Sequence, residues 1–247
     1  MDINRARLYS ILESMTLSEH QRYNIGTYKE KKLHYIMKKY FEPDENYHEV
    51  PVNGFIADIL RDNRITEIES AGFSGLGPKL AAYSPDYDVT MVHPLCAVKY
   101  VSWIDPESGT ISPRKKSPKK EGPYDLLFEL IRIMPYICNK NIRFVSPLLE
   151  VDEYKLLDGW SKDRKRGAHR FERIPLDIID MVCLETDDDY IKYIPEACVE
   201  KFKVKDFAKA ARIDAHKAQA VLKVMEKRGV IARDGNAGRA FLYSRTK

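Results

Sequence analysis

The sequence predicts an α/β fold in which a mixed β-sheet is flanked by helices, followed by a small C-terminal domain. Two observations lead to this class. Apolar residues at helical spacing alternate with short apolar runs of strand type between residues 28 and 151. An acidic segment with three consecutive aspartates, residues 185–189, then precedes a stretch of different composition. These patterns divide the chain into an N-terminal helical segment (1–27), the α/β domain (28–174) and the C-terminal domain (175–247).

Helices are expected at the start of the chain. The first covers residues 4–14, and the second, residues 28–41, is basic and amphipathic. The inward face of the second helix is formed by Leu33, Ile36, Met37 and Tyr40. Glu30 and His34 lie one turn apart on it. Either they form a solvent-facing pair on a charged helix, or Glu30 is directed at a site and His34 is a hydrogen-bonding neighbour or a substrate contact.

The central feature of the predicted sheet is a β-hairpin, in which apolar runs at residues 50–60 and 65–68 flank a polar turn. Alternation along a strand puts Asp58 on the face of Ile56 and Leu60, and Glu67 on the face of Glu69. Carboxylates are costly to bury unless a cation satisfies them. Acids that converge from adjacent strands form an oxygen-rich pocket, which suits Mg²⁺ or Mn²⁺ far better than Zn²⁺.

The elements that follow complete the α/β pattern. A glycine-rich loop (residues 70–78) leads into a short helix (78–83) and then into strands at 88–95 and 96–104. A turn at 105–109 would return the chain as a second hairpin strand at 110–112. Beyond it we expect a helix at 124–134, a strand at 142–151 and a helix at 175–184 that starts near a proline.

Basic segments interrupt these elements. Residues 113–120 hold five cations, two prolines and no acid, which predicts an exposed loop. Residues 158–173 hold a second cluster in which Trp160 and Phe171 interleave, a composition suited to phosphates and bases, although Trp160 could equally anchor a core. We expect the segments to flank one nucleic-acid groove; a solvated linker is the alternative for the first. The predicted contacts are Arg114, Lys115, Lys116, Lys119, Lys120, Lys162, Arg164, Lys165, Arg166 and Arg170.

The C-terminal domain reads as a helix at residues 204–211, a helix at 215–228 and strands at 230–233 and 239–243. Asp214 and Gly229 are suitable residues for the two ends of the second helix. Its inward stripe is Ala218, Val221, Leu222 and Met225, which leaves His216, Lys217, Gln219, Ala220 and Lys223 outside. This order resembles a winged helix-turn-helix. The resemblance implies DNA contacts from Lys217, Gln219, Lys223, Arg233 and Arg239, and the alternative is a winged helix used for packing or protein contacts.

Residues 28–105 resemble the core of the PD-(D/E)XK, or restriction-endonuclease-like, nuclease superfamily. Asp58 matches its first acid, and Glu67-Ile68-Glu69 matches its (D/E)-x-K element. Glu30 stands where the Holliday-junction-resolvase branch keeps a helix glutamate. The resemblance implies that Glu30, Asp58 and Glu67 hold Mg²⁺ or Mn²⁺, with the Ile68 carbonyl as a further ligand. The sequence departs at Glu69, where the family has a lysine that acts on the attacking water, so that Glu69 itself or Lys79 would take this role.

With Glu69 in place of the family's lysine, the sequence leaves three hypotheses open. The first is a metal-dependent DNA endonuclease, acting on double-stranded or branched DNA. The second is a nuclease-like DNA-binding protein or regulator without catalysis, which Glu69 supports. In the third, the acids stabilise a sheet edge through lysine and arginine pairs, and the partner is a protein or RNA. Many members of both resembled families work as dimers, so a homodimer is a further expectation.

Composition supports a soluble protein. Charged residues make up 32% of the chain, the net charge is only +4, and the four cysteines lie in apolar runs without a C-x-x-C pair. We therefore expect reduced core thiols and a cytoplasmic location. No signal sequence or apolar run of transmembrane length is present, which predicts no membrane association.

Overall fold

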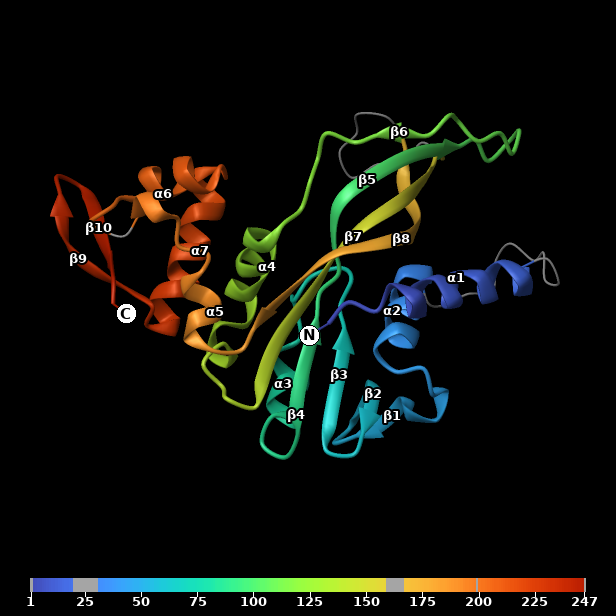
Figure 1. Ribbon diagram of the computed structural model, residues 1–247, viewed down its shortest axis with the longest axis horizontal. Coiled ribbons are helices and arrows are strands. Elements are labelled where there is room, and N and C mark those ends of the chain that lie inside the picture. The colour runs from blue at the N-terminus through green and yellow to red at the C-terminus, as the bar shows by residue number, and fades with distance from the viewer. Residues whose placement is uncertain (1, 20–30, 159–166, 199, 247) are drawn as a thin grey trace. The chain divides into compact units, whose positions relative to one another are not determined.

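A computed structural model describes residues 2–19, 31–158, 167–198 and 200–246 (Figure 1). It confirms the α/β class with a mixed sheet and flanking helices. The chain forms two compact units. Unit 1 consists of Met1–His48, Pro94–Glu121 and Pro147–Met181, and unit 2 of Glu49–His93, Gly122–Ser146 and Val182–Lys247. None of the described helices is long and apolar enough to span a membrane.

The sheet of unit 2 has the strand order β1-β2-β3-β4-β7. Its strands are β1 (His48–Val52), β2 (Phe55–Arg61), β3 (Arg64–Ile68), β4 (Asp88–Val92) and the first residues of β7 (Ile142–Leu156). β2 pairs antiparallel with β3, whereas β4 is parallel to both β3 and β7. The predicted hairpin and the strands predicted at 88–95 and 142–151 are therefore confirmed.

Short turns set the registers in this sheet. The run predicted as one strand over residues 50–60 is divided at Asn53 and Gly54, which have φ angles of 46° and 83°. Asn-Gly favours this two-residue turn because both positions need the left-handed region. A second turn lies between β2 and β3, where Asp62 has a φ of 54°. The chain thus forms a three-strand meander from His48 to Ile68.

Helices of unit 2 lie beside these strands. The side-chain amide of Asn53 donates a hydrogen bond to the Ala82 carbonyl at 2.8 Å, which ties α3 (Gly77–Tyr83) to the first turn of the meander. The helix predicted at 124–134 is α-helical over α4 (Pro123–Glu129) and continues as the 3₁₀-helix η2 (Leu130–Tyr136). Pro135 lies inside η2, and Ile133 departs from helical geometry there.

The C-terminal part of unit 2 begins with α5 (Asp187–Ile191) and η3 (Glu196–Cys198), and continues as α6 (Val204–Ala211), α7 (Ala215–Arg228), β9 (Ile231–Ala237) and β10 (Ala240–Arg245). Both predicted helix ranges are confirmed. The Asp214 carboxylate accepts a hydrogen bond from the Lys217 amide at 2.8 Å, and Gly229 ends α7 with a φ of 78°. The predicted inward stripe is buried, but the prediction that Ala220 faces outward is wrong, because α7 also packs against α4 and η2.

Unit 1 contains α1 (Arg5–Glu19), α2 (Lys32–Phe41), the 3₁₀-helix η1 (Glu45–Tyr47), β5 (Leu95–Ile104), β6 (Lys115–Lys116), the later residues of β7 and β8 (His169–Leu184). β5 runs parallel to β7 and antiparallel to β6, and β8 also pairs with β7. The predicted inward face of α2 is buried. The return strand predicted at 110–112 is reduced to one bridge between Ile104 and Ile111.

The helix predicted at residues 175–184 is wrong, because this segment belongs to β8. Pro175, Ile178 and Val182 are buried at intervals of three and four residues, which is the spacing of a helix face. Pairing with β7, the preceding strand, decides the conformation instead. The predicted domain boundary between residues 174 and 175 falls inside the same strand.

Candidate active site

Asp58 and Glu67 lie on the β2–β3 hairpin. The register pairs Ile59 with Thr66, and its continuation brings Asp58 opposite Glu67. Residues opposite one another on antiparallel strands share one face of a sheet. The Asp58 carboxylate accepts a hydrogen bond from the Ile68 amide at 2.7 Å, which fixes it beside the end of β3.

Glu67 is the most enclosed acid of this group, with 4% of its surface exposed. One carboxylate oxygen, Oε2, lies 2.6 Å from the Lys79 ammonium on α3. The other, Oε1, is buried and accepts no hydrogen bond from the part of the chain that the structure describes. Burial and the charge of Asp58 raise the pKa of Glu67 to about 7 against the opposing effect of Lys79. A cation at Oε1 would satisfy the oxygen and relieve the repulsion between the two acids.

Tyr83 on α3 lies close enough to Glu67 and Asp58 for their charges to act on it. Together with burial, these charges raise the pKa of its hydroxyl. The hydroxyl is buried and, like Glu67 Oε1, has no hydrogen-bond partner among the described residues. The ring packs edge-on against Phe55, with centroids 6.1 Å apart. Tyr83 could not be identified from the sequence, because its position beside the acids depends on how α3 lies against the hairpin.

Replacing Tyr83 by phenylalanine is expected to raise the free energy of unfolding by about 1 kcal/mol, because it removes an unsatisfied buried hydroxyl. Tyr124→Phe is the matched control: the Tyr124 hydroxyl donates to the Tyr193 carbonyl at 3.1 Å, and its loss should cost about 1 kcal/mol. Urea unfolding of both variants measures the difference. Equal destabilisation by the two substitutions would show that the Tyr83 hydroxyl is satisfied.

Glu69 lies just beyond β3 and contributes to a turn. Its side chain accepts a hydrogen bond from the Ala71 amide at 2.9 Å, and its amide donates to the Val92 carbonyl at 2.8 Å. The buried His93 places Nδ1 2.6 Å from the Glu69 carbonyl and packs against Phe73. The role of Glu69 in orienting water stays a prediction. His93 was predicted only as the end of a strand.

The donor set fits a hard divalent cation. No three His, Cys, Asp or Glu side chains gather as a metal site within residues 2–19, 31–158, 167–198 and 200–246. Glu30, the third predicted ligand, lies outside the described residues. Mg²⁺ usually takes one or two protein carboxylates and completes its shell with water and substrate phosphate. Asp58 and Glu67, with an unsatisfied oxygen on Glu67, match this requirement.

The first predicted DNA-binding segment is exposed, as expected. Lys115 and Lys116 form β6, and Lys119 and Lys120 follow it on the surface. The Arg114 guanidinium lies 2.6 Å from the Asp152 carboxylate and 3.6 Å from the centre of the Tyr100 ring. Asp152 raises the pKa of Arg114 further, so this arginine is already engaged within unit 1. Of the second segment, Lys162, Arg164, Lys165, Arg166 and Trp160 lie outside the described residues.

The predicted contacts of the C-terminal part fall into two groups. Gln219, Lys223 and Arg239 are exposed. Lys217 instead forms an ion pair with Asp125 of α4 at 2.6 Å, and its neighbour His216 packs edge-on against Phe128. Arg233 pairs with Glu226 at 3.0 Å and lies over the Phe241 ring. The start of α7 therefore contributes to packing within unit 2.

Lys217→Ala is expected to lower the free energy of unfolding by about 0.5–1 kcal/mol, since it breaks a partly exposed ion pair. Lys223→Ala, at an exposed position of the same helix, should change it by less than about 0.5 kcal/mol. Denaturant unfolding at low salt and in 1 M NaCl measures both, and salt should shrink the Lys217 effect. If Lys217→Ala leaves the stability unchanged, the ion pair with Asp125 contributes nothing and Lys217 is available to contact DNA.

Comparisons with known proteins extend to much of this chain. A protein of Treponema pallidum (strain Nichols), described as an uncharacterized protein, is 27% identical over 146 residues, which cover 57% of this chain and 58% of the relative. The chain therefore matches less than two-thirds of that relative's length. No solved structure matches significantly.

One family match includes the hairpin acids. It covers residues 31–185, more than half of the chain, and so contains Asp58, Glu67 and Lys79 together with the basic segment at 113–120. It ends before α6 and α7. This chain therefore belongs to the family described as Domain of unknown function (DUF8091).

Proposed function

We propose that this protein is a metal-dependent DNA endonuclease that hydrolyses phosphodiester bonds with Mg²⁺ or Mn²⁺. The observation that carries the proposal is the buried Oε1 of Glu67 beside Asp58, which accepts no hydrogen bond from the described residues. Burial and the charge of Asp58 raise the pKa of Glu67 to about 7, and Oε1 has no hydrogen-bond partner among the described residues. Such an arrangement costs stability unless a cation binds there.

Asp58 and Glu67 would hold the metal. When bound, Mg²⁺ would lower the pKa of a coordinated water and neutralise charge on the scissile phosphate. Lys79 supplies a fixed positive charge within 2.6 Å of Glu67. In this proposal it takes the place of the lysine that the nuclease pattern has at position 69, and it orients the attacking water or the phosphate.

DNA would be held by exposed cations. Those of the first basic segment are Lys115, Lys116, Lys119 and Lys120, and those of the C-terminal part are Lys223 and Arg239. A restriction-endonuclease-like core with a winged helix would bring double-stranded or branched DNA to the acids, and a homodimer would cut both strands. Affinity should then fall steeply with salt, because each phosphate contact releases counterions.

A second candidate function is DNA binding without catalysis, in a regulator built on a nuclease-like core. The Glu69 carboxylate favours this second function, because the carboxylate accepts a hydrogen bond from the Ala71 amide. Supercoiled plasmid incubated with Mg²⁺, Mn²⁺ or EDTA separates the two functions. Metal-dependent nicking supports the endonuclease, whereas a metal-independent gel shift without nicking in any metal supports the regulator and overturns the endonuclease.

A further inference from the structure

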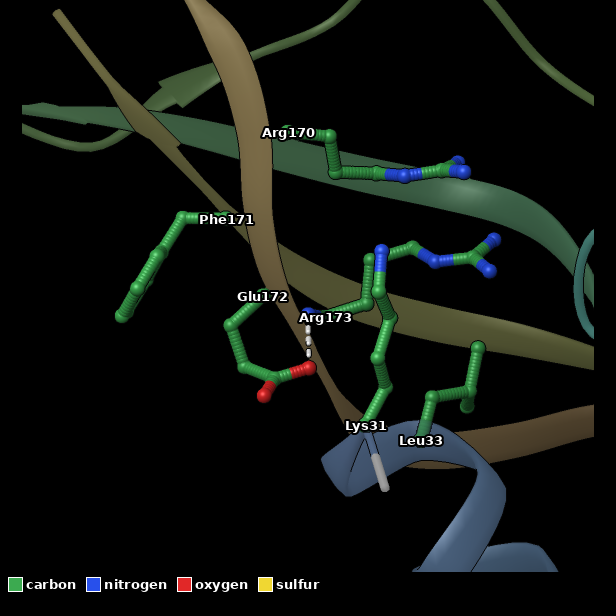
Figure 2. A pocket seen from close by; sticks show the side chains of 6 residues that line it. All are labelled: Lys31, Leu33, Arg170, Phe171, Glu172 and Arg173. Carbon is green, nitrogen blue, oxygen red and sulfur yellow. Dashed lines mark hydrogen bonds between the residues drawn. The ribbon is translucent and has the colours of Figure 1, made fainter. Parts of the chain in front are cut away.

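A cationic pocket lies in unit 1, at the start of α2 and the first residues of β8. It is lined by Lys31, Leu33, Arg170, Phe171, Glu172 and Arg173. Figure 2 shows the three cationic side chains directed to the same side of β8, while Phe171 and Glu172 point to the other side. The segments that supply these cations are more than 130 residues apart in the sequence. Folding therefore brings three positive charges together.

Two cations of the pocket, Lys31 and Arg170, are exposed. Lys31 and Arg170 form no ion pair within the part of the chain that the structure describes, although Arg5, Arg114, Arg132, Arg228 and Arg233 all do. Among the described residues that line the pocket, Glu172 is the one acid, and its carboxylate accepts a hydrogen bond from the Arg173 amide at 2.9 Å. Like charges held near one another repel, so this arrangement favours an anion that enters from solution.

Fixed geometry adds to the charge. Arg173 is 7% exposed, and its Nη1 lies 3.6 Å from the Cys96 sulfur, so its position is set by the fold. Lys31 is also the N-cap residue of the ten-residue helix α2, and its own side chain makes no capping hydrogen bond. A helix N-terminus carries partial positive charge and presents backbone amides to an anion. The pocket thus combines two guanidinium groups, one ammonium and a helix N-terminus.

We propose that this pocket binds a phosphate group. A guanidinium pairs two oxygens of a phosphate through parallel hydrogen bonds, and an ammonium contributes a compact charge. Arg170 and Lys31 can therefore both bind oxygens of one phosphate, and Arg173 adds positive charge to the pocket. The phosphate comes either from free phosphate or from a nucleic-acid strand, and the chemistry of the pocket is the same for both. The proposal does not depend on nuclease activity.

Calorimetric titration of the protein with inorganic phosphate, at constant ionic strength set with chloride, tests the proposal. Saturable binding is expected, and Lys31→Gln and Arg170→Gln should each weaken it about 10-fold, because each removes a charge-assisted hydrogen bond. Both side chains are exposed, so folding should be unaffected, and circular dichroism checks this. Arg245→Gln removes the same charge from an exposed position of unit 2 and should leave binding unchanged.

Oligonucleotides identify the source of the phosphate. Tighter binding of a 5′-phosphorylated strand than of the same strand with a 5′-hydroxyl, lost in Arg170→Gln, indicates a strand end. Equal binding of both strands, weakened in Arg170→Gln, indicates an internal phosphodiester, and binding of inorganic phosphate alone indicates the free ion. The proposal is overturned if no phosphate compound binds saturably, or if Arg245→Gln weakens binding as much as Arg170→Gln.

Discussion

Asp58→Ala is expected to reduce metal-dependent nicking of supercoiled plasmid by about 1000-fold, which corresponds to about 4 kcal/mol of transition-state stabilisation. In the proposed site the substitution removes one of two carboxylates on the hairpin and leaves Glu67 as the other. DNA binding should be largely retained, because Asp58 adds negative charge and no phosphate contact. Initial nicking rates in Mg²⁺ and Mn²⁺, with gel shifts in EDTA, measure both quantities.

Two asparagine variants make this test specific. Asp58→Asn keeps an oxygen that can accept the hydrogen bond from the Ile68 amide but loses the charge, so it should be folded and inactive. Asp62→Asn makes the same change in the adjacent turn, where asparagine tolerates the positive φ of 54°, and it should stay active. Nicking by Asp58→Ala at the wild-type rate, with contaminating nuclease excluded, would remove Asp58 from the site and with it the proposed mechanism.

A loss of about 3 kcal/mol in stability from Glu67 alone is expected as the pH rises from 4.5 to above 7. Burial and Asp58 raise the pKa of Glu67 from 4.5 to about 7. The folded protein therefore holds a proton that the unfolded chain releases within this interval. The stabilisation is complete below pH 4.5 and is lost as the pH passes through 7. Urea unfolding at intervals between pH 4.5 and 8.5 measures it.

Glu67→Gln isolates this contribution from other titrating groups. Glutamine keeps an oxygen that can accept a hydrogen bond from Lys79, and it carries no charge at any pH. The stability of the variant should therefore not show the fall with pH that Glu67 causes, and the variant should be more stable than wild type at pH 8.5. Mg²⁺ at that pH should stabilise wild type and not the variant, because it binds the ionised carboxylate. If the free energy of unfolding changes with pH in the same way in the two proteins, the pKa of Glu67 is not raised by folding.

Elements with local signals were predictable from the sequence. Asp214 and Gly229 act through backbone groups within a few residues, and they fix both ends of α7 at the predicted positions. Asn53-Gly54 carries an equally local turn signal, and it explains the division of a run that apolar pattern alone had joined. Sequence can therefore provide boundaries wherever the deciding contacts are short-range.

Long-range contacts decide the remaining features. Part of β8 has buried residues at helical intervals, and the segment becomes a strand because β7 supplies its pairing partner. Lys217 pairs with Asp125, 92 residues away. The position of Lys217 on its helix therefore could not show that it forms an ion pair. Asp58 and Glu67 were identified from their pattern. The enclosure of Glu67, its pair with Lys79 and the unsatisfied hydroxyl of Tyr83 depend on how α3 lies against the hairpin.

The hairpin turn also determines which changes in chain length the acid pair can tolerate. Asp58 and Glu67 approach one another through a single two-residue turn, so insertions beyond residues 58–67 leave the pairing between them intact. An insertion of one residue within β2 or β3 shifts the register by one position and turns one carboxylate to the opposite face of the sheet. In relatives of this chain that keep both acids for one purpose, the spacing of eight intervening residues should therefore be invariant while the loops around it vary in length.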